Sequence, residues 1–448
     1  MNQALYLVVG LGKTGHSIAG YLQRRNLPFV VYDTREQPPD REEFSRQFPG
    51  VDVFFGDFPI ELYSQLTEIV VSPGVALDAL FIQEAQRFGI PIVGDIECLA
   101  REITAPAIAI TGTNGKSTVT TLLGEMAKEA GLSVAVAGNI GMPVLDLLDD
   151  GQHYDLWVLE LSSFQLDLVY SLKPRAATIL NVSPDHLDRH HSLAGYVAAK
   201  QRIYLQAHTL IYNRDDIETF PFEQPRVSPA NTTSFGLNPA TGMDWGIVSQ
   251  QGKQYLARGS QSMMAVEQLR IKGKHNWQNA LAACALAEAA GIEFRHVQAV
   301  LQSFPGLAHR CQWVRTLDGV EWINDSKGTN IGATISAIAG IGGNLLGKIV
   351  LIAGGLGKGA DFTELRPSVS AYVRSLVLIG TDADKIEQAL SDIAPTVRAN
   401  SFEEAILQAR SEAKPGDVVL LSPACASLDM FRDFNHRGES FANLVEAL

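Results

Sequence analysis

Short apolar runs alternate with helical stretches along almost the whole chain, and this alternation restricts the fold more than any other feature. The runs LYLVV (5–9) and FVVYD (29–33) enclose a glycine turn and a helical stretch, and the runs EIVVSPG (68–74) and IPIVGD (90–95) continue the pattern. Strands that alternate with helices in this way form parallel βαβ units. We therefore expect a Rossmann-like α/β domain over residues 1–95.

The same alternation returns twice more, first from the run PAIAIT and then from near Gly306. Buried apolar runs separated by helical stretches again indicate doubly wound sheets. The expected strands of the second set are 106–111, 132–138, 156–162, 176–182 and 209–213, and those of the third set are 322–326, 348–355, 374–380 and 417–425.

The segment GTNGKST (112–118) lies between the strand PAIAIT and the helical stretch VTTLLGEMAKEAG. Glycines let backbone N–H groups close around phosphate oxygens, and the start of a helix adds the positive end of its dipole. Lys116 offers a charge to the β- and γ-phosphates, and Ser117 or Thr118 offers a hydroxyl to Mg²⁺. The segment therefore predicts an ATP site, whose backbone cradle consists of Gly112, Thr113, Asn114 and Gly115.

The predicted ATP loop departs from the usual GxxxxGK[ST] pattern. Ile110 stands where the first glycine of that pattern is expected, so the loop is two residues shorter. The alternative interpretation is an ordinary glycine-rich turn between a strand and a helix. A Lys-Ser-Thr sequence at that place serves no packing need, which favours the phosphate site.

The remaining part of the second set differs in composition. Residues 214–275 are richer in polar and turn residues and predict short antiparallel strands, whereas 273–292 predict a helix that a glycine ends. The predicted fold class is therefore α/β with three domains. A Rossmann-like domain (1–95) is followed by a central domain (96–305) with a P-loop ATPase-like parallel sheet and a small antiparallel sheet, and then by a Rossmann-like C-terminal domain (306–448).

The composition of the chain disfavours several classes of protein. Its 448 residues favour two or three domains, and a formal charge of −13 disfavours nucleic acid as a partner. No uncharged run of about 18 apolar residues occurs, so we expect no membrane insertion. The four cysteines are scattered and the N-terminus lacks a signal-peptide pattern, which favours a reducing, cytoplasmic location. We expect a monomer that acts on small molecules.

Three other side chains follow or accompany the strands near the predicted ATP loop. Glu160 ends the run LWVLE, where a carboxylate suits Mg²⁺, although a solvent-facing strand end is the alternative. His186 follows a further strand and would ligate a metal or orient a substrate, although a lone histidine is usually structural. Lys200 lies in the helical stretch YVAAKQRIY, and periodicity alone makes it a surface lysine.

The segment GLGKTG (10–15) matches the pattern G-x-G-x-x-G, and Asp33 ends the next strand. This combination is typical of NAD binding, so a dehydrogenase is an alternative hypothesis. Thr34 and Arg35 suit a phosphate or a different nucleotide, and no set of residues for hydride transfer can be picked out. The pattern therefore predicts a pyrophosphate site at a helix start, which a nucleotide-linked substrate would fill.

Eight segments stand in an order that resembles the Mur ligase family of peptidoglycan synthesis, over essentially the whole chain. They are GTNGKST, LELSSFQL (159–166), NVSPDHLDRH (181–190), AAKQRIY (198–204), GKHNWQN (273–279), HR (309–310), NDSKGTN (324–330) and SPACASLDMF (422–431). The last two segments resemble the family member that adds D-glutamate, rather than the members that add L-alanine, a diamino acid or a dipeptide.

The resemblance implies an ADP-forming ligase. ATP would phosphorylate the carboxylate of UDP-N-acetylmuramoyl-L-alanine, the amine of D-glutamate would attack the acyl phosphate, and a tetrahedral intermediate would collapse to an amide. Phosphoryl transfer depends on positioning and charge neutralisation, which suits the lysines and metal ligands in these segments. The implied cofactors are ATP, two Mg²⁺ ions and a carbamate on Lys200, and the implied partners are the two small-molecule substrates.

The resemblance also implies a role for individual residues. Lys116, His186 and Lys200 would be catalytic, and the metal ligands would be Ser117, Glu160, His186 and the carbamylated Lys200. The nucleotide would further contact Asn276, Asn279, Arg310 and Asp325. The UDP-sugar would contact Lys13, Thr14, Asp33, Thr34, Arg35, Gly74, Asn139, Ser162 and Gln165, and D-glutamate would contact Lys327, Thr329, Lys358, Ser427, Leu428 and Phe434.

Other interpretations remain, both for single residues and for the function of the whole chain. Lys358 is also compatible with a solvated loop, and Ser427 and Phe434 with a helix cap and a core position. Folylpolyglutamate synthetases share the ATP loop and the lysine carbamate, but they lack a separate dinucleotide-like first domain such as the one expected over residues 5–95. A non-catalytic nucleotide-binding regulator would keep the loop and lack the chemistry.

Overall fold

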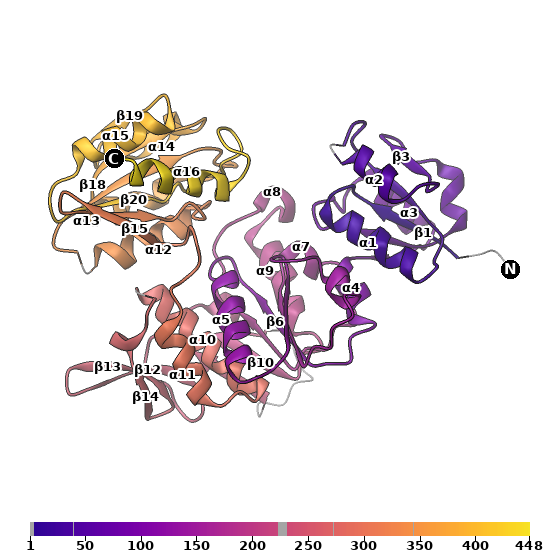
Figure 1. Ribbon diagram of the computed structural model, residues 1–448, viewed down its shortest axis with the longest axis horizontal. Helices are drawn as coiled ribbons and strands as arrows, with labels where there is room; N and C mark the ends of the chain where they lie inside the picture. The colour runs from indigo at the N-terminus through magenta and orange to yellow at the C-terminus, as the bar shows by residue number, and fades with distance from the viewer. Residues whose placement is uncertain (1–3, 39, 223–230, 272, 344) are drawn as a thin grey trace. The chain divides into compact units, whose positions relative to one another are not determined.

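The computed structural model describes residues 4–38, 40–222, 231–271, 273–343 and 345–448, which contain three β-sheets (Figure 1). The chain divides into two compact units. The first runs from the N-terminus to Val182 and adds residues 189–266 and 279–300, and the second consists of 183–188, 267–278 and 301–448. The domain limits near residues 95 and 305 stay a prediction.

Five parallel strands form the N-terminal sheet in the order β3-β2-β1-β4-β5. This is the order of a doubly wound dinucleotide-binding sheet, so the Rossmann-like expectation is confirmed. β3 was not expected, because three residues are too few to give a periodic signal. The elements are β1 (Leu5–Val9), α1 (Lys13–Arg24), β2 (Phe29–Asp33), α2 (Arg41–Gln47), β3 (Val53–Phe55), β4 (Leu66–Val71), α3 (Leu80–Arg87), β5 (Ile92–Val93) and α4 (Asp95–Ala100).

Strand β1 is buried on both faces, which explains its continuous apolar run. Leu7 lies in a core cluster with Phe81 of α3, whereas Val8 lies in a second cluster with Ile18 of α1. Parallel sheets that helices cover on both sides have strands of this kind. The second cluster continues into Ala109 of the central sheet, so the N-terminal and central sheets of the first unit share one core.

Nine strands form the central sheet, in the order β14-β13-β12-β11-β10-β9-β6-β8-β7. The strands are β6 (Ala107–Thr111), β7 (Val134–Gly138), β8 (Leu156–Glu160), β9 (Ala176–Ile179), β10 (Thr209–Asn213), β11 (Thr232–Phe235), β12 (Trp245–Gln250), β13 (Lys253–Arg258) and β14 (Gln261–Ala265). The helices of this part of the chain are α5 (Lys116–Glu129), α6 (Val144–Leu148), α7 (Ser163–Leu166), α8 (Leu187–His190), α9 (Leu193–Gln201), α10 (Lys274–Ala290) and α11 (Phe294–Ser303).

The expectation for residues 214–275 is partly wrong. Strands β12, β13 and β14 are antiparallel, but they extend the parallel sheet at its edge, because β11 pairs in parallel with both β10 and β12. The result is one mixed sheet instead of a separate antiparallel sheet. Residues 223–230 and 272, which that expectation included, lie outside the described residues. Helix α10 confirms the predicted helix and ends one residue before Gly291.

Six strands form the C-terminal sheet in the order β15-β16-β20-β17-β18-β19, parallel except for β15. Leu351 of β17 packs in a cluster with Ile338 of α12, and its neighbour Ile352 packs with Phe441 of α16, so helices cover both faces. The elements are β15 (Gln312–Leu317), β16 (Val320–Asn324), α12 (Ile331–Gly342), β17 (Ile349–Gly354), α13 (Arg366–Tyr372), β18 (Val373–Ile379), α14 (Ala383–Leu390), β19 (Thr396–Arg398), α15 (Phe402–Glu412), β20 (Val418–Leu421) and α16 (Phe434–Glu446). No helix of the described residues is long and apolar enough to cross a membrane.

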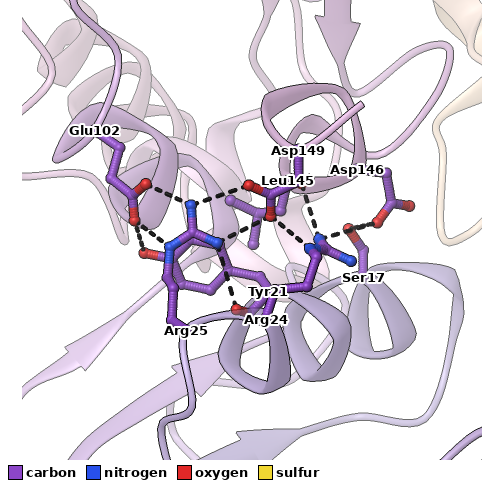
Figure 2. A network of polar contacts seen from close by, with 8 residues as sticks. All are labelled: Ser17, Tyr21, Arg24, Arg25, Glu102, Leu145, Asp146 and Asp149. Atoms are coloured by element: carbon purple, nitrogen blue, oxygen red, sulfur yellow. Dashed lines mark hydrogen bonds and ion pairs between the residues drawn. The ribbon is translucent and has the colours of Figure 1, made fainter. Parts of the chain in front are cut away.

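A polar network within the first unit joins α1 to the central part of the chain (Figure 2). The guanidinium of Arg25, which follows α1, lies between the carboxylates of Glu102 and Asp149, with Nη1 2.9 Å from Asp149 Oδ2. Tyr21 donates a hydrogen bond to Glu102 at 2.6 Å, and Arg24 donates one to Asp149 at 2.7 Å. Because the acceptors precede β6 and follow α6, the network ties the N-terminal sheet to two central segments.

Candidate active site

The loop GTNGKST turns directly from β6 into α5, as the sequence predicts. Gly115 immediately precedes α5 and has φ +82°, a conformation that costs other residues about 1 kcal/mol or more. A Cβ on Gly115 would lie 2.4 Å from Asn279 Oδ1, so a larger residue here would displace the Asn279 side chain. The start of α5 therefore presents its N–H groups and the positive end of its dipole at the loop.

Asn181, which follows β9, holds the predicted ATP loop from a neighbouring strand. Its carbonyl oxygen accepts a hydrogen bond from Thr113 N at 2.9 Å. Its side chain accepts from Asn114 N at 2.9 Å and donates to Asn114 O at 3.1 Å. Asn181 was not among the predicted site residues, although its place after a strand adjacent to β6 was an available signal.

The three residues that begin α5 supply the side chains of the loop. Lys116 Nζ donates to the carbonyl oxygens of Gly112 and Thr113 at 2.8 Å each, so the ammonium group lies over the loop backbone. Ser117 and Thr118 are buried. An anion bound in the loop would therefore meet both the helix start and a cation that the loop itself orients.

Glu160 ends β8, the strand beside β6, and is only 2% exposed. Its Oε1 accepts a hydrogen bond from Asn139 Nδ2 at 3.1 Å, and its Oε2 is buried with no hydrogen-bond partner. Buried carboxylate oxygens usually have a partner or a metal, so this orphaned oxygen fits ligation to Mg²⁺. Across the described residues, no three His, Cys, Asp or Glu side chains gather as a metal cluster, so hydroxyl, phosphate or carbamate oxygens would have to complete such a site.

Lys200 is buried, so the interpretation of a surface lysine from periodicity is wrong. It belongs to α9 and is 1% exposed. Its Nζ donates to Gly112 O at 2.9 Å and lies 4.4 Å from the centre of the Tyr196 ring. Periodicity misses this position because the residues of α9 around it are small or apolar on nearly every side. The structure thus brings Lys200 to the backbone of the predicted ATP loop.

The residues predicted to bind the UDP-sugar in the N-terminal sheet follow three adjacent strands. Lys13 and Thr14 begin α1 after β1, Thr34 follows β2, and Gly74 lies in the turn after β4. Because β2, β1 and β4 are parallel neighbours, these positions lie at the same carboxyl edge of the sheet. A Cβ on Gly15 would lie 1.8 Å from Gly10 O, so the tight turn before α1 requires glycine.

Asp33 is already engaged by its own loop. Its Oδ2 accepts from Leu11 N at 2.8 Å, and Arg35 donates to both carboxylate oxygens, at 2.9 and 2.7 Å. Burial works against its ionisation, but the hydrogen bonds from Arg35 and Leu11 outweigh burial and hold the pKa of Asp33 below its usual value. The carboxylate therefore fixes the turn after β1 and the direction of the Arg35 side chain.

The central sheet adds three residues of the predicted UDP-sugar set. Asn139 follows β7, donates from its backbone N–H to Glu160 O at 2.8 Å and thereby stays beside the end of β8. Ser162 and Gln165 form a capping box at the start of α7, because Gln165 N donates to Ser162 Oγ at 3.1 Å and Ser162 N donates to Gln165 Oε1 at 3.1 Å. Asn139 also bonds the Glu160 side chain, and Ser162 and Gln165 follow Glu160 closely in the sequence.

In the second unit, the predicted D-glutamate residues occupy one edge of the C-terminal sheet. The loops after β16, β20 and β17 meet there, because these strands are parallel neighbours. Lys327 Nζ lies 3.8 Å from the centre of the Phe434 ring, and Lys358 has φ +52° in the loop after β17. Thr329 follows β16, Ser427 is buried, and Leu428 is 66% exposed. The structure thus brings all six residues to loops or a helix start at this edge.

Asp325 and Arg437 are buried beside these loops and hold them through hydrogen bonds. Asp325 accepts from Ser422 Oγ at 2.7 Å and from Cys311 N at 3.1 Å, and burial raises its pKa to about 6. Arg437, which the sequence analysis did not single out, is 1% exposed and donates to Ser326 O at 2.8 Å and to Cys425 O at 3.2 Å. A buried arginine three residues after Phe434 has no signature in a single sequence.

The other predicted nucleotide and metal residues lie in different parts of the chain. His186 has φ +52°, belongs to the second unit, and its Nε2 lies 3.8 Å from Asp185 Oδ2. Helix α10 crosses the limit between the units, so Asn276 belongs to the second and Asn279 to the first. Arg310 is partly buried in the second unit.

Family models match nearly the whole chain. The Mur ligase MurD-like N-terminal domain matches residues 4–94, the Mur ligase middle domain matches 110–287, and the Mur ligase glutamate ligase domain matches 309–425. The UDP-N-acetylmuramoylalanine--D-glutamate ligase of Legionella pneumophila (strain Paris) is 63% identical over 448 residues, 100% of both chains. The chain belongs to the Mur ligase family. The protein of the same name from Pseudomonas aeruginosa is 49% identical over 442 residues, which cover 99% of this chain and 98% of that protein.

Solved structures of Mur ligases and a related enzyme share the fold. A pseudomurein peptide ligase type C from Methanothermus fervidus has a TM-score of 0.63 at 19% identity, over 99% of both chains. The MurF ligase of Thermotoga maritima, solved in complex with ADP, has a TM-score of 0.61 at 16% identity, over 100% of this chain and 98% of the other. Because the family's N-terminal model matches residues 4–94, the G-x-G-x-x-G pattern is part of the Mur ligase fold and the dehydrogenase hypothesis loses its main support.

Proposed function

We propose that this chain joins D-glutamate to UDP-N-acetylmuramoyl-L-alanine in an ATP-dependent reaction that releases ADP and phosphate, as a step of peptidoglycan precursor synthesis. The observation that carries the proposal is the 63% identity, over the full length of both chains, to a relative named for this activity. The loop from Gly112 to Thr118, with Glu160 and Lys200 beside it, supplies the chemistry that such a reaction needs.

ATP binds with its phosphates in the loop between β6 and α5. The N–H groups at the start of α5 and the Lys116 ammonium neutralise the charge that develops on the transferred phosphoryl group. Asn276, Asn279, Arg310 and Asp325 contact the rest of the nucleotide in this proposal. Asn276 and Asn279 support it because residues three apart share one face of α10.

Magnesium is the metal that the donor set fits. Glu160 supplies a carboxylate whose Oε2 is buried without a hydrogen-bond partner, Ser117 supplies a hydroxyl, and His186 is the third candidate ligand. Mg²⁺ neutralises phosphate charge and takes oxygen ligands from carboxylates, hydroxyls and phosphates. We propose two ions, as the resemblance to the family implies.

A carbamate on Lys200 is the remaining oxygen donor. The neutral amine of Lys200 would attack the carbon of CO₂: a C–N bond would form as one C=O π bond opens onto oxygen, and one proton would leave the nitrogen to give an anionic carbamate. The buried position of Lys200 beside Thr111 and Gly112 supports this modification, because burial favours the neutral amine that the reaction requires. The product would place a metal-binding anion beside the loop.

The reaction then proceeds in two displacements. A carboxylate oxygen of the alanyl end attacks the γ-phosphorus, and the bond to ADP breaks as Lys116 and the start of α5 hold the phosphate charge. The amine nitrogen of D-glutamate attacks the acyl carbon, the amine loses a proton, and phosphate leaves to complete the amide. Both steps require the reacting atoms of the three substrates to be close and correctly oriented. The protein contributes this positioning.

D-glutamate binds at the carboxyl edge of the C-terminal sheet. It is a dicarboxylate, and Lys327 and Lys358 supply two positive charges on the loops after β16 and β17, which flank the loop after β20. Thr329 and Ser427 offer hydroxyl groups beside them. Leu428 and Phe434 would contact the methylene groups of the substrate.

The UDP-sugar binds along the carboxyl edge of the N-terminal sheet. The start of α1 at Lys13 and Thr14 suits the pyrophosphate, and Arg35, oriented by Asp33, adds a positive charge. Thr34 and Gly74 line the same edge. Asn139, Ser162 and Gln165 continue the site toward Glu160, where the carboxylate reacts.

We also propose that the protein acts in the cytoplasm as a monomer. All four cysteines are free thiols, which suits a reducing compartment, and one chain supplies every residue assigned to the site. Cell fractionation and sedimentation at micromolar concentration test these two statements.

The test of the proposed function is ADP release by the purified chain. ADP should appear only when ATP, UDP-N-acetylmuramoyl-L-alanine and D-glutamate are all present, and L-glutamate should not replace the D-isomer. Release with folate in place of the UDP-sugar, or release that needs no amino acid, would overturn the proposal. The Glu160→Gln variant, which keeps the shape of the side chain and removes its charge, should lose about 10²-fold or more in rate.

A further inference from the structure

The start of α16 is held against the C-terminal sheet by bonds that do not involve the loops of the predicted D-glutamate site. Asp433 caps the helix, because its side chain accepts from His436 N at 2.8 Å. Asn324, which ends β16, donates from its side chain to Gly438 O at 2.9 Å. A Cβ on Gly438 would lie 2.3 Å from His309 Nδ1, so the helix approaches that residue closely. The start of α16 is therefore a fixed support for the side chains that it carries.

Arg437 belongs to this helix, and its guanidinium bonds two loops at once. Nη2 donates to Ser326 O at 2.8 Å and to Cys425 O at 3.2 Å, and Nη1 donates to Cys425 O at 3.3 Å. Nε donates to Ser326 Oγ at 3.0 Å. Ser326 lies in the loop after β16, and Cys425 lies in the loop after β20. A single planar group thus joins these two loops to α16.

Ser326 extends the effect of this contact to residues of the predicted D-glutamate site. Its Oγ, which accepts from Arg437, donates to Phe434 O at 2.8 Å. Lys327 is the next residue, and its Nζ lies 3.8 Å from the centre of the Phe434 ring. The placement of Lys327 relative to Phe434 therefore depends on the position of Ser326. The other loop that Arg437 bonds leads directly to Ser427, which is buried.

A charged residue is costly at this position. Arg437 is 1% exposed, and among the described residues it forms no ion pair with a carboxylate, so only neutral acceptors compensate the burial of its charge. Burial lowers the pKa of Arg437 to about 10, so the guanidinium still carries its charge at pH 7. A methionine would avoid this cost, but it would supply no donor to the loops. What arginine adds is a rigid, planar set of donors that reaches two segments.

We propose that Arg437 is a positioning residue for the amino-acid substrate, which sets the spacing of Lys327, Ser427 and Phe434 so that they receive D-glutamate. This inference rests on the proposed function. Arg437 is buried and does not touch the substrate; it acts through the loops after β16 and β20. D-glutamate has two carboxylates and a reacting amine to be placed, so a change in this spacing weakens its binding and leaves the sites of the other two substrates intact.

The test is the kinetics of ADP release by full-length variants, with KM measured separately for the three substrates. Arg437→Lys keeps the charge, but one nitrogen cannot replace the three that bond the two loops. It should raise KM for D-glutamate about tenfold or more, the effect of lost hydrogen bonds from a charged group, and leave KM for ATP and for UDP-N-acetylmuramoyl-L-alanine unchanged. Its kcat at saturating D-glutamate should change less than KM does.

Ser326→Ala tests the path of the effect, because it removes the hydroxyl between Arg437 and Phe434. It should raise the same KM, and its combination with Arg437→Lys should raise KM by less than the product of the two single effects. Arg374→Met is the matched control, because Arg374 Nε bonds Asp417 Oδ2 at 2.6 Å at the amino ends of β18 and β20, the opposite edge of the same sheet. It should lower the melting temperature and leave KM for D-glutamate unchanged.

A wild-type KM for D-glutamate in Arg437→Lys, or single effects that multiply, would rule the inference out, and so would an equal rise of this KM in Arg374→Met. If the wild type releases no ADP with D-glutamate, the proposed function fails, and hydrogen exchange still decides the role of Arg437. Arg437→Lys should speed the exchange of residues 326–329 and 425–428 and leave that of β18 unchanged. Equal exchange in the two chains would also rule the inference out.

Discussion

Lys200 Nζ lies 2.9 Å from the carbonyl oxygen of Gly112, so a lysine from α9 contacts the backbone of the predicted ATP loop. This contact joins two segments that are 88 residues apart in the sequence. It has a structural consequence, because it restrains the loop, and a chemical one, because the same nitrogen is the proposed site of the carbamate.

Lys200→Ala should reduce the rate of ADP release by at least about 10²-fold, because it removes a charged group from a water-excluded site. Acetate or another short-chain acid should restore part of the activity if it takes the place of the carbamate. Lys200→Arg separates the two roles, because arginine keeps a donor for Gly112 O and cannot form the carbamate. Lys128→Ala, at an exposed position of α5, is the control. Full activity of untreated Lys200→Ala, or of Lys200→Arg, would refute the carbamate.

Gly115→Ala should abolish ATP binding, and Gly131→Ala should not. Both glycines have φ +82°, so both substitutions cost about 1 kcal/mol or more of stability from backbone strain. They differ in space, because a Cβ on Gly115 would lie 2.4 Å from Asn279 Oδ1, whereas a Cβ on Gly131 meets nothing within 4 Å. Calorimetric titration with ATP measures the difference. Equal ATP affinity of the two variants would show that the contact with Asn279 is irrelevant.

Arg25→Met should lower the free energy of unfolding by about 1–2 kcal/mol and loosen the N-terminal sheet from the central part of the first unit. The substitution keeps an apolar stem and leaves Glu102 and Asp149 without their shared cation. Arg87→Met, which breaks an exposed pair with Glu84 on α3, should change stability by less than about 0.5 kcal/mol. Urea unfolding and hydrogen exchange of β1 measure both effects, and equal losses in the two variants would contradict the role of Arg25.

The stability of the second unit should depend on pH through His275. Burial lowers the pKa of His275 to about 4, and its Nδ1 is buried without a hydrogen-bond partner. The folded state therefore binds the proton less readily than the unfolded state, whose histidine titrates near 6.5. The stability from this group is complete above pH 6.5 and is lost as the pH falls toward 4, by about 2–3 kcal/mol.

The comparison of wild type with His275→Gln isolates this group, because glutamine does not titrate. Between pH 7.5 and pH 4.5 the wild type should lose about 2–3 kcal/mol more free energy of unfolding than His275→Gln does. A difference that stays constant over this range would mean that His275 is not shielded from water.

Periodicity identified strands with long apolar runs and missed those without them. The run KIVLIAGG predicted β17 because helices cover both faces of that strand, so every side chain of Ile349–Gly354 is apolar or small. Val53–Phe55 and Thr396–Arg398 are three residues long and half-buried, and they are strands only because a neighbouring strand pairs with them. The pairing of β11 with β12 consists of a single residue pair, Phe235 with Trp245, and no local sequence pattern predicts it.

The sequence by itself determined the positions of the predicted ligand loops. A glycine turn between a strand and a helix at 112–118 has a local physical cause, because the backbone conformation and the helix start are properties of that short segment. The alternation of runs likewise determined the parallel strands of the three sheets, because strands buried on both faces must be apolar throughout.

Only the tertiary structure decided which side chains surround those loops. Lys200 is buried against Gly112, Asn181 bonds the predicted ATP loop from its place after β9, and Glu97 of α4 accepts from the backbone of Tyr170 and Ser171. These pairs are distant in the sequence, and the energy of each depends on burial and on the neighbour that packing provides. A hydrogen bond between distant segments leaves no periodic trace in either of them, and for that reason the folded chain was needed to find it.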